Sequence, residues 1–344
     1  MTRRVERHRL VVLRALGLGD FLTGVPAMRA LRHACPEHEI VLAAPRVIEP
    51  LVRLSGVVDT VLDTRGLVPI AWSGEPPELA VNLHGRGPES HRLLAELAPR
   101  RLVAFGSPAA GHEGPEWTAD EHEVRRWCRL VGSALHIRTD PADLQLRAPA
   151  TPPIVSNAVV IHPGAAYPSR RWPPDRFAEV ARWVRQHGHT VVVTGGPDEV
   201  KVAEEVCHAA GLPPSAVLAG RTDLRELAAL VAAARLVVCG DTGVAHLASA
   251  YSTASVVLFG PTAPDRWGPP QDGRHVALWH GEGTGDPWGA QPDPALLRIG
   301  TDEVLGHVEE LLALGSTESE SQAGEPLDGP LESLLEVDPR APVE

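Results

Sequence analysis

The sequence has no uninterrupted apolar run long enough to cross a membrane, although 43% of its 344 residues are hydrophobic. Because a membrane-spanning helix needs about 20 mostly apolar residues, no such helix is predicted. The basic opening MTRRVERHRL leads into an apolar stretch too short for the core of a secretory signal peptide. We therefore expect a cytoplasmic protein.

Cysteine and lysine are also scarce. The four cysteines (Cys35, Cys128, Cys207 and Cys239) show no spacing typical of a metal site, and Lys201 is the only lysine. Reduced, buried thiols and no bound metal are the expectation. The net charge is −12, and the sequence contains no cluster of basic residues that could bind phosphate backbones. We therefore expect no nucleic-acid partner.

What the sequence has is a twofold series of alternating strand and helix patterns. Strands are expected in HRLVVLRA, EIVLAAP, VDTVLD, PELAVNLHG and RRLVAF, and again in AVVIHPG, HTVVVTGG, LVVCG and ASVVLFGPT, with a short one near Ala216. Helical patterns lie between them, and one is expected over residues 117–135. Such alternation predicts two α/β domains, each with a parallel sheet covered by helices on both faces.

The pattern also predicts the domain boundaries. Residues 1–153 form the first domain and residues 154–300 the second, joined by the Pro-rich stretch LRAPATPP. A helix over residues 301–314 follows the completed second sheet. Residues 315–344 are rich in Ser, Glu, Gly and Pro and are expected to be a disordered acidic tail.

The segment LVVCGDTGVAHLA, residues 236–248, carries the strongest functional signal. A buried strand runs directly into a helix that starts near Asp241, Thr242 and Gly243. Free amides and the helix dipole at such a start favour an anion, and His246 lies one turn further on. The segment predicts a phosphate pocket, and a capped helix with a buried histidine is the alternative.

The first strand ends in LGLGD, which only partly imitates a dinucleotide-binding turn. Gly17 and Gly19 are present, but Leu22 stands where the third glycine would be, so a nicotinamide or flavin site is disfavoured. Asp20 then lies on a tight turn at the carboxyl edge of the first sheet. It is expected to act as a general base or to cap the following helix.

Two further turns at the edge of the second sheet carry charged residues. Arg170 and Arg171 precede a helix, and the planar guanidinium of Arg170 is suited to phosphate oxygens, whereas Arg171 is expected to be solvated. In TGGPDE, Asp198 or Glu199 is expected either to bind ribose hydroxyls or to cap a helix.

Several segments together resemble glycosyltransferase family nine, the family of the ADP-heptose:lipopolysaccharide heptosyltransferases. They are GDFLTGVPAMRAL, HPGAAYPSRRWPPDRFAEVA, GGPDE, and GDTGVAHLASAY followed by VVLFGPTAPDRWGP. The resemblance spans residues 10 to about 314, in the family's order and spacing. It implies a GT-B fold, in which two Rossmann-like domains face each other across a cleft and the final helix crosses back onto the first domain. The N-terminal domain would take the acceptor and the C-terminal domain the nucleotide sugar.

The resemblance also implies roles for individual residues. Asp20 matches the catalytic base, with Gly19 and Thr23 beside it in the acceptor-facing loop. Arg170 stands where heptosyltransferases carry a phosphate-neutralising lysine, and Asp198 matches the ribose contact. The remaining donor contacts fall on the second helix start: Asp241 for the sugar, and Thr242, Gly243 and His246 for the diphosphate and sugar.

The function implied is inverting, metal-independent transfer of a heptose-like sugar from a nucleoside-diphosphate sugar, with an ADP-sugar expected. No cofactor is expected, and the acceptor is a hydroxyl of a glycan, a lipid-linked glycan or a metabolite. A monomer with peripheral association at the inner membrane face is expected. The alternatives are a nucleotide-sugar epimerase or hydrolase on the same fold, and a non-catalytic nucleotide-sugar-binding protein.

Overall fold

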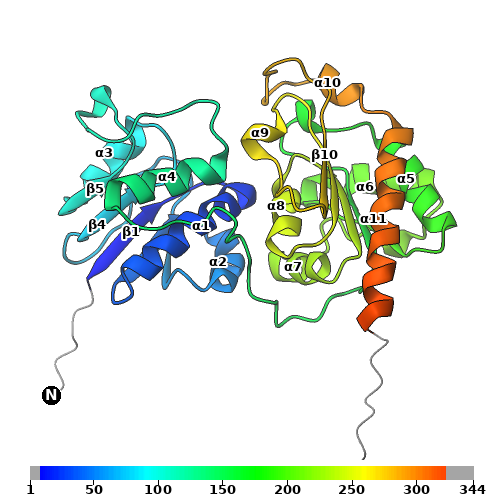
Figure 1. Ribbon diagram of the computed structural model, residues 1–344, viewed down its shortest axis with the longest axis horizontal. Coiled ribbons are helices and arrows are strands. Elements are labelled where there is room, and N and C mark those ends of the chain that lie inside the picture. Colours follow the sequence, from blue (N-terminus) through cyan, green and yellow to red (C-terminus); the bar gives the residue numbers. More distant parts are fainter. Residues whose placement is uncertain (1–7, 323–344) are drawn as a thin grey trace, which may run out of the picture.

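The strands form two separate parallel sheets in the computed structural model, which describes residues 8–322 (Figure 1). The first sheet has the order β3-β2-β1-β4-β5 and the second the order β10-β9-β8-β6-β7. In each sheet the order reverses beside the first strand of its domain. This is the arrangement in which α/β proteins bind ligands at the carboxyl ends of the strands.

The N-terminal domain follows the alternation expected from the sequence. Its strands are β1 (Arg9–Leu13), β2 (Glu39–Ala44), β3 (Thr60–Asp63), β4 (Leu79–Asn82) and β5 (Arg101–Val103). Its helices are α1 (Leu18–Ala34), α2 (Glu49–Ser55), α3 (Glu89–Ala95) and α4 (Glu123–Leu135). The chain then continues through residues 136–157 to the second domain.

The C-terminal domain repeats the pattern. Its strands are β6 (Val159–His162), β7 (Val191–Val193), β8 (Leu236–Gly240), β9 (Ser255–Leu258) and β10 (His275–Leu278). Its helices are α5 (Pro174–Gln186), α6 (Val200–Ala210), α7 (Leu224–Ala232), α8 (Gly243–Ala250), α9 (Pro264–Trp267), α10 (Pro294–Leu297) and α11 (Thr301–Gln322).

The central strands are apolar because helices cover both faces of each sheet. Every residue of β6 and β8 is buried, and these two strands pair directly. One continuous apolar cluster extends from α1 and α2 of the first domain to α7 and α8 of the second. The domains therefore pack against each other through helices that begin at the carboxyl edges of the sheets.

Helix α11 differs from the expectation. Val304, Val308, Leu311 and Leu312 are buried in the apolar cluster of the second domain, and α11 packs on α5, β8 and β9. In Figure 1 it lies on the side of that domain away from α1. The prediction that this helix crosses back onto the first domain is therefore wrong for the residues the structure describes. Its apolar face is already covered by its own sheet.

Three boundaries also differ. The helix expected from residue 117 begins at Glu123, and no strand forms near Ala216, where Val217 makes an isolated bridge to Val193. Helix α11 continues to Gln322, so residues 315–322 of the expected disordered tail are helical. The rest of that tail, residues 323–344, lies outside the described residues. No helix within residues 8–322 is long and apolar enough to span a membrane.

Candidate active site

The starts of α1 and α8 meet at the domain interface. A Cβ atom on Gly19 would lie 2.8 Å from Cδ2 of His246 and 3.4 Å from Cα of Gly243. A Cβ atom on Gly243 would in turn lie 2.9 Å from the side chain of Leu18. The two glycines therefore permit an approach that larger residues would prevent. This contact brings the candidate base and the candidate phosphate pocket together.

Asp20 is the third residue of α1 and caps its start. Its Oδ2 accepts a hydrogen bond from the Gly17 N–H at 3.3 Å, and its Oδ1 lies 3.9 Å from Nη2 of Arg14. The side chain keeps 30% of its surface exposed. Burial raises the pKa of Asp20, Arg14 opposes that rise and Glu123 adds to it. A partly exposed carboxylate with a raised pKa is suited to accepting a proton, so capping and catalysis are compatible here.

Asp241 and Arg170 form the charged part of the candidate donor site. Asp241 directly follows β8, and its Oδ2 lies 4.0 Å from Nη1 of Arg170. The contact depends on Gly240, because a Cβ atom there would lie 2.9 Å from the Arg170 carbonyl oxygen. Burial raises the pKa of Asp241 to about 6, Arg170 lowers it and nearby Asp20 raises it. Arg170, the expected phosphate contact, therefore lies beside Asp241, the expected sugar contact.

Thr242 precedes α8 with extended backbone dihedrals, and its side chain makes no capping hydrogen bond. The first amides of a helix, here those of Gly243 and Val244, have no acceptor within the helix. His246 lies one turn further on with its ring centroid 5.8 Å from that of Trp267. Burial, together with His122 and Arg14, lowers the pKa of His246 to about 4. The start of α8 thus offers backbone amides and a neutral imidazole.

In the TGGPDE turn Glu199 is half-buried, whereas Asp198 is exposed. Oε2 of Glu199 accepts a hydrogen bond from the Gly196 N–H at 2.7 Å and lies 3.9 Å from Nε2 of His162. Its carboxylate lies against Gly164, where any Cβ atom would collide with it. Glu199 is therefore the acid whose carboxylate is held next to the carboxyl end of β6, and the ribose contact stays a prediction.

Thr23 does not reach the surface of the protein, so it is not the acceptor-facing residue that was expected. It is 1% exposed, and its hydroxyl donates to the Asp20 carbonyl oxygen at 2.9 Å and accepts from Nη2 of Arg14 at 2.9 Å. It therefore supports the backbone of Asp20 from below.

Sequence reasoning missed the buried polar network beneath Asp20. Arg14 is fully buried and ion-paired with Glu123, which also pairs with Arg126. The signal was a charged residue at the end of an apolar strand, VVLRA, since arginine is rarely buried without a partner. Within residues 8–322 no group of three or more His, Cys, Asp or Glu side chains is placed to hold a metal ion.

Known proteins share both sequence and fold with this chain. A sequence profile described as glycosyltransferase family 9 (heptosyltransferase) matches residues 115–285. Lipopolysaccharide heptosyltransferase 3 of Escherichia coli is 32% identical over 166 residues, which are 47% of this chain and 48% of that protein. The chain thus spans about half the length of this curated relative.

Solved structures extend the likeness to nearly the whole fold. ADP-heptose lipopolysaccharide heptosyltransferase II of Escherichia coli superposes with a TM-score of 0.72 at 20% identity, covering 90% of this chain and 99% of that one. Escherichia coli heptosyltransferase WaaC with ADP gives 0.68 at 18% identity, covering 88% and 99%. The two facing α/β domains are accordingly a GT-B fold. In sequence, residues 115–285 of the chain are thus similar to glycosyltransferase family 9, and the relatives that match the chain are heptosyltransferases.

Proposed function

We propose that this protein is a glycosyltransferase that moves a heptose-like sugar from a nucleoside-diphosphate sugar to an acceptor hydroxyl with inversion at the anomeric carbon. The observation that carries the proposal is the contact between the starts of α1 and α8. It places the Asp20 carboxylate beside Asp241 and the Thr242–Gly243–His246 helix start. A base and a diphosphate pocket on facing domains are the two parts that direct transfer requires.

The donor is proposed to be an ADP-sugar bound to the C-terminal domain. One structural relative is described with ADP, and the curated relatives are heptosyltransferases. The diphosphate would lie over the first amides of α8, where the helix dipole favours negative charge. Arg170 would contact the phosphate oxygens from its turn, and Glu199 rather than Asp198 would accept hydrogen bonds from the ribose hydroxyls.

In the proposed mechanism Asp20 takes the proton from the acceptor hydroxyl as that oxygen attacks the anomeric carbon. The bond from this carbon to the diphosphate oxygen breaks on the opposite face, so the configuration inverts. Negative charge grows on the leaving diphosphate, and Arg170 and the α8 amides stabilise it. Because these groups supply positive charge at the leaving oxygen, we propose that transfer does not need a metal ion.

The acceptor is proposed to be a glycan, a lipid-linked glycan or a metabolite that enters from the N-terminal domain beside Asp20 and Gly19. The relative from Escherichia coli is named for lipopolysaccharide, and that acceptor is one arm of the test below. The monomeric state, the cytoplasmic location and peripheral association with a membrane stay predictions.

The experiment has two stages. Thermal unfolding is first measured with ADP-, GDP-, UDP- and dTDP-sugars, since binding to the folded state raises the transition temperature. Turnover of the stabilising donor is then measured with and without lipopolysaccharide cores, glycolipids and small hydroxyl acceptors. Acceptor-dependent release of ADP supports the proposal. Donor consumption without acceptor would indicate an epimerase or hydrolase, and binding without turnover a non-catalytic protein.

A further inference from the structure

A chain of buried polar contacts runs from Asp20 to the other domain. It begins at Arg14, whose side chain is fully buried at the carboxyl end of β1. Arg14 donates through Nε to the Asp20 carbonyl oxygen and through Nη1 to the Leu83 carbonyl oxygen. Its Nη2 donates to Thr23 Oγ1 at 2.9 Å. Arg14 therefore fixes the backbone of Asp20 as well as facing its carboxylate.

Glu123, the first residue of α4, forms an ion pair with Arg14. Its Oε1 accepts from Nη2 of Arg14 at 3.2 Å and from Nε1 of Trp127 at 2.8 Å. Its Oε2 pairs with Nη1 of Arg126. One carboxylate thus holds two buried guanidinium groups, and each buried charge has a partner.

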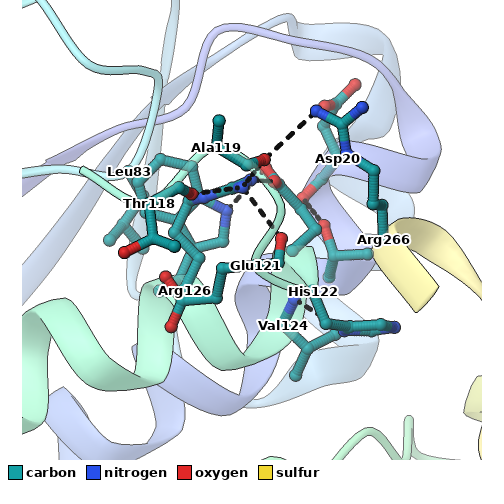
Figure 2. A network of polar contacts seen from close by, with 12 residues as sticks. Asp20, Leu83, Thr118, Ala119, Glu121, His122, Val124, Arg126 and Arg266 are labelled. Atoms are coloured by element: carbon teal, nitrogen blue, oxygen red, sulfur yellow. Dashed lines mark hydrogen bonds and ion pairs between the residues drawn. The ribbon is translucent and has the colours of Figure 1, made fainter. Parts of the chain in front are cut away.

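The polar contacts continue into the segment before α4 (Figure 2). Nη2 of Arg126 donates to the carbonyl oxygens of Thr118, Ala119 and Glu121 at 2.8–3.1 Å. The Ala119 carbonyl also accepts from Nη2 of Arg266 at 3.1 Å, and Arg266 belongs to α9 of the other domain. A single carbonyl oxygen is therefore shared by an arginine from each domain.

A second contact links the segment before α4 to α9 of the other domain. Nε2 of His122 is 3.1 Å from the carbonyl oxygen of Gly268, just after α9. Trp267, the last residue of α9, packs on His246 of α8, one of the proposed donor contacts. The element that covers the donor histidine is therefore the one that holds the network beneath Asp20.

We propose that Arg14 and Glu123 are positioning residues for Asp20, and that Arg266 completes the same device from the donor domain. When α9 packs on residues 118–122, it holds the start of α4 in place. The start of α4 carries Glu123, which in turn holds Arg14 and the first turn of α1. The base is thereby held in its working position when the two domains are together. This inference rests on the proposed function, in which Asp20 takes the acceptor proton.

The electrostatic consequence follows from the groups around Asp20. Arg14 and Glu123 face it from its own domain, and Asp241 faces it from the other. His246 borders Gly19, and His122 lies at the start of α4. Glu123 opposes the attraction between Arg14 and the Asp20 carboxylate, so it helps to keep Asp20 a competent base.

Glu123→Gln tests this step, because glutamine keeps an oxygen for Arg14 and Trp127 but removes the charge. The pKa of Asp20 is expected to fall by about one unit, the effect of an opposite charge left uncompensated nearby. The pKa is read from a ¹³C NMR titration of the carboxyl groups, with Asp20→Asn identifying the signal. Glu123→Asp, which keeps the charge, is expected to restore the wild-type value. The acid limb of the pH profile of kcat should move with the NMR value while the donor KM stays unchanged.

Glu121→Gln is the matched control, because its carboxylate pairs with Arg129 at 2.7–2.8 Å and makes no contact with Arg14. An Asp20 titration that is unchanged in Glu123→Gln, or equally shifted in Glu121→Gln, overturns the inference. The titration needs no turnover. If the wild-type protein transfers no sugar, the proposed function fails, while the titration still decides whether Glu123 tunes Asp20.

Arg266→Met tests the contact that Arg266 makes across the domain interface. Because Arg266 is not fully buried, this variant remains available if Glu123→Gln does not fold. We expect kcat to fall about tenfold, the effect of one hydrogen bond from a charged donor, with the donor KM changed less than about twofold. Arg92→Met is the control, since it loses a 2.7 Å contact to the Ala109 carbonyl within one domain. Unchanged kcat in Arg266→Met, or an equal loss in Arg92→Met, contradicts the interdomain step.

Discussion

Replacing Asp20 by asparagine separates the two roles that the structure gives this side chain. Asparagine keeps the size of the group and an oxygen that can accept from the Gly17 N–H, so the start of α1 is preserved. It cannot accept a proton at neutral pH. The substitution therefore removes the proposed base and leaves the capping contact.

The expected sizes follow from these contacts. Loss of a general base lowers kcat by about 10²- to 10⁴-fold, or about 2.7–5.4 kcal/mol in the activation free energy. Stability should not fall with it. Burial raises the pKa of Asp20 in the folded state, so ionisation destabilises the fold as the pH rises from the ordinary value of 3.8 through the folded value. At neutral pH the asparagine variant avoids this cost, and its Tm should equal or exceed that of the wild type.

Three measurements on the same preparation test this reasoning. Donor affinity by calorimetry should be within about twofold of the wild-type value, because the donor contacts lie on the other domain. Single-turnover rates should show the loss, and thermal unfolding should show none. Transfer within a factor of ten of the wild-type rate would refute Asp20 as the base. A lower Tm with proportionally lower donor affinity would mean that the carboxylate has only a structural role.

Three further predictions concern the interface and the donor pocket. Gly19→Ala places a Cβ atom 2.8 Å from His246 and should cost about 1–3 kcal/mol of stability together with most of the activity. Gly17→Ala is the control and should cost neither, because its Cβ atom would meet only a side-chain oxygen at 3.6 Å. Equal Tm and kcat values in the two variants would contradict the close approach. Arg170→Ala should raise the donor KM about 10- to 100-fold with Arg170→Lys close to wild type, and activity should persist in EDTA; loss in EDTA that Mg²⁺ restores would refute the account of the phosphate charge. The pKa of Asp241 is raised to about 6, so the free energy of unfolding should decline as the pH rises from about 4 to about 6. Asp241→Asn should flatten that part of the profile of unfolding free energy against pH. An unchanged profile would show that Asp241 is not the titrating group.

The fold was largely predictable because buried parallel strands are short apolar runs between turn residues, as in β6 and β8. The start of α4 was not, because Trp117 fits the helical period. In the structure its ring packs edge-on against those of Phe105 and Trp127 from a segment that is not helical. Periodicity records that a residue is apolar and not which conformation carries it to the core.

In the candidate site, too, some residues could be predicted from the local sequence and others could not. Asp20, Arg170 and Asp241 were found by their positions after strands, since the carboxyl ends of parallel strands lie at one edge. Asp198 and Glu199 carry the same charge at adjacent positions, and only the local turn decides which one points back to the Gly196 N–H. Arg14 and Glu123 are 109 positions apart, so no local pattern could pair them.

Because α11 packs on its own sheet, the chain passes between the domains only once within residues 8–322, through residues 136–157. Leu146 in this connection is buried, and its N–H donates to the carbonyl oxygen of Ala250 at the end of α8. Each half thus keeps a complete sheet with its own helices, and the single connection acts as a tether that keeps the two halves at a high effective concentration. After a protease cut within it, the association of the two halves would depend on dilution, which would measure the strength of the domain interface.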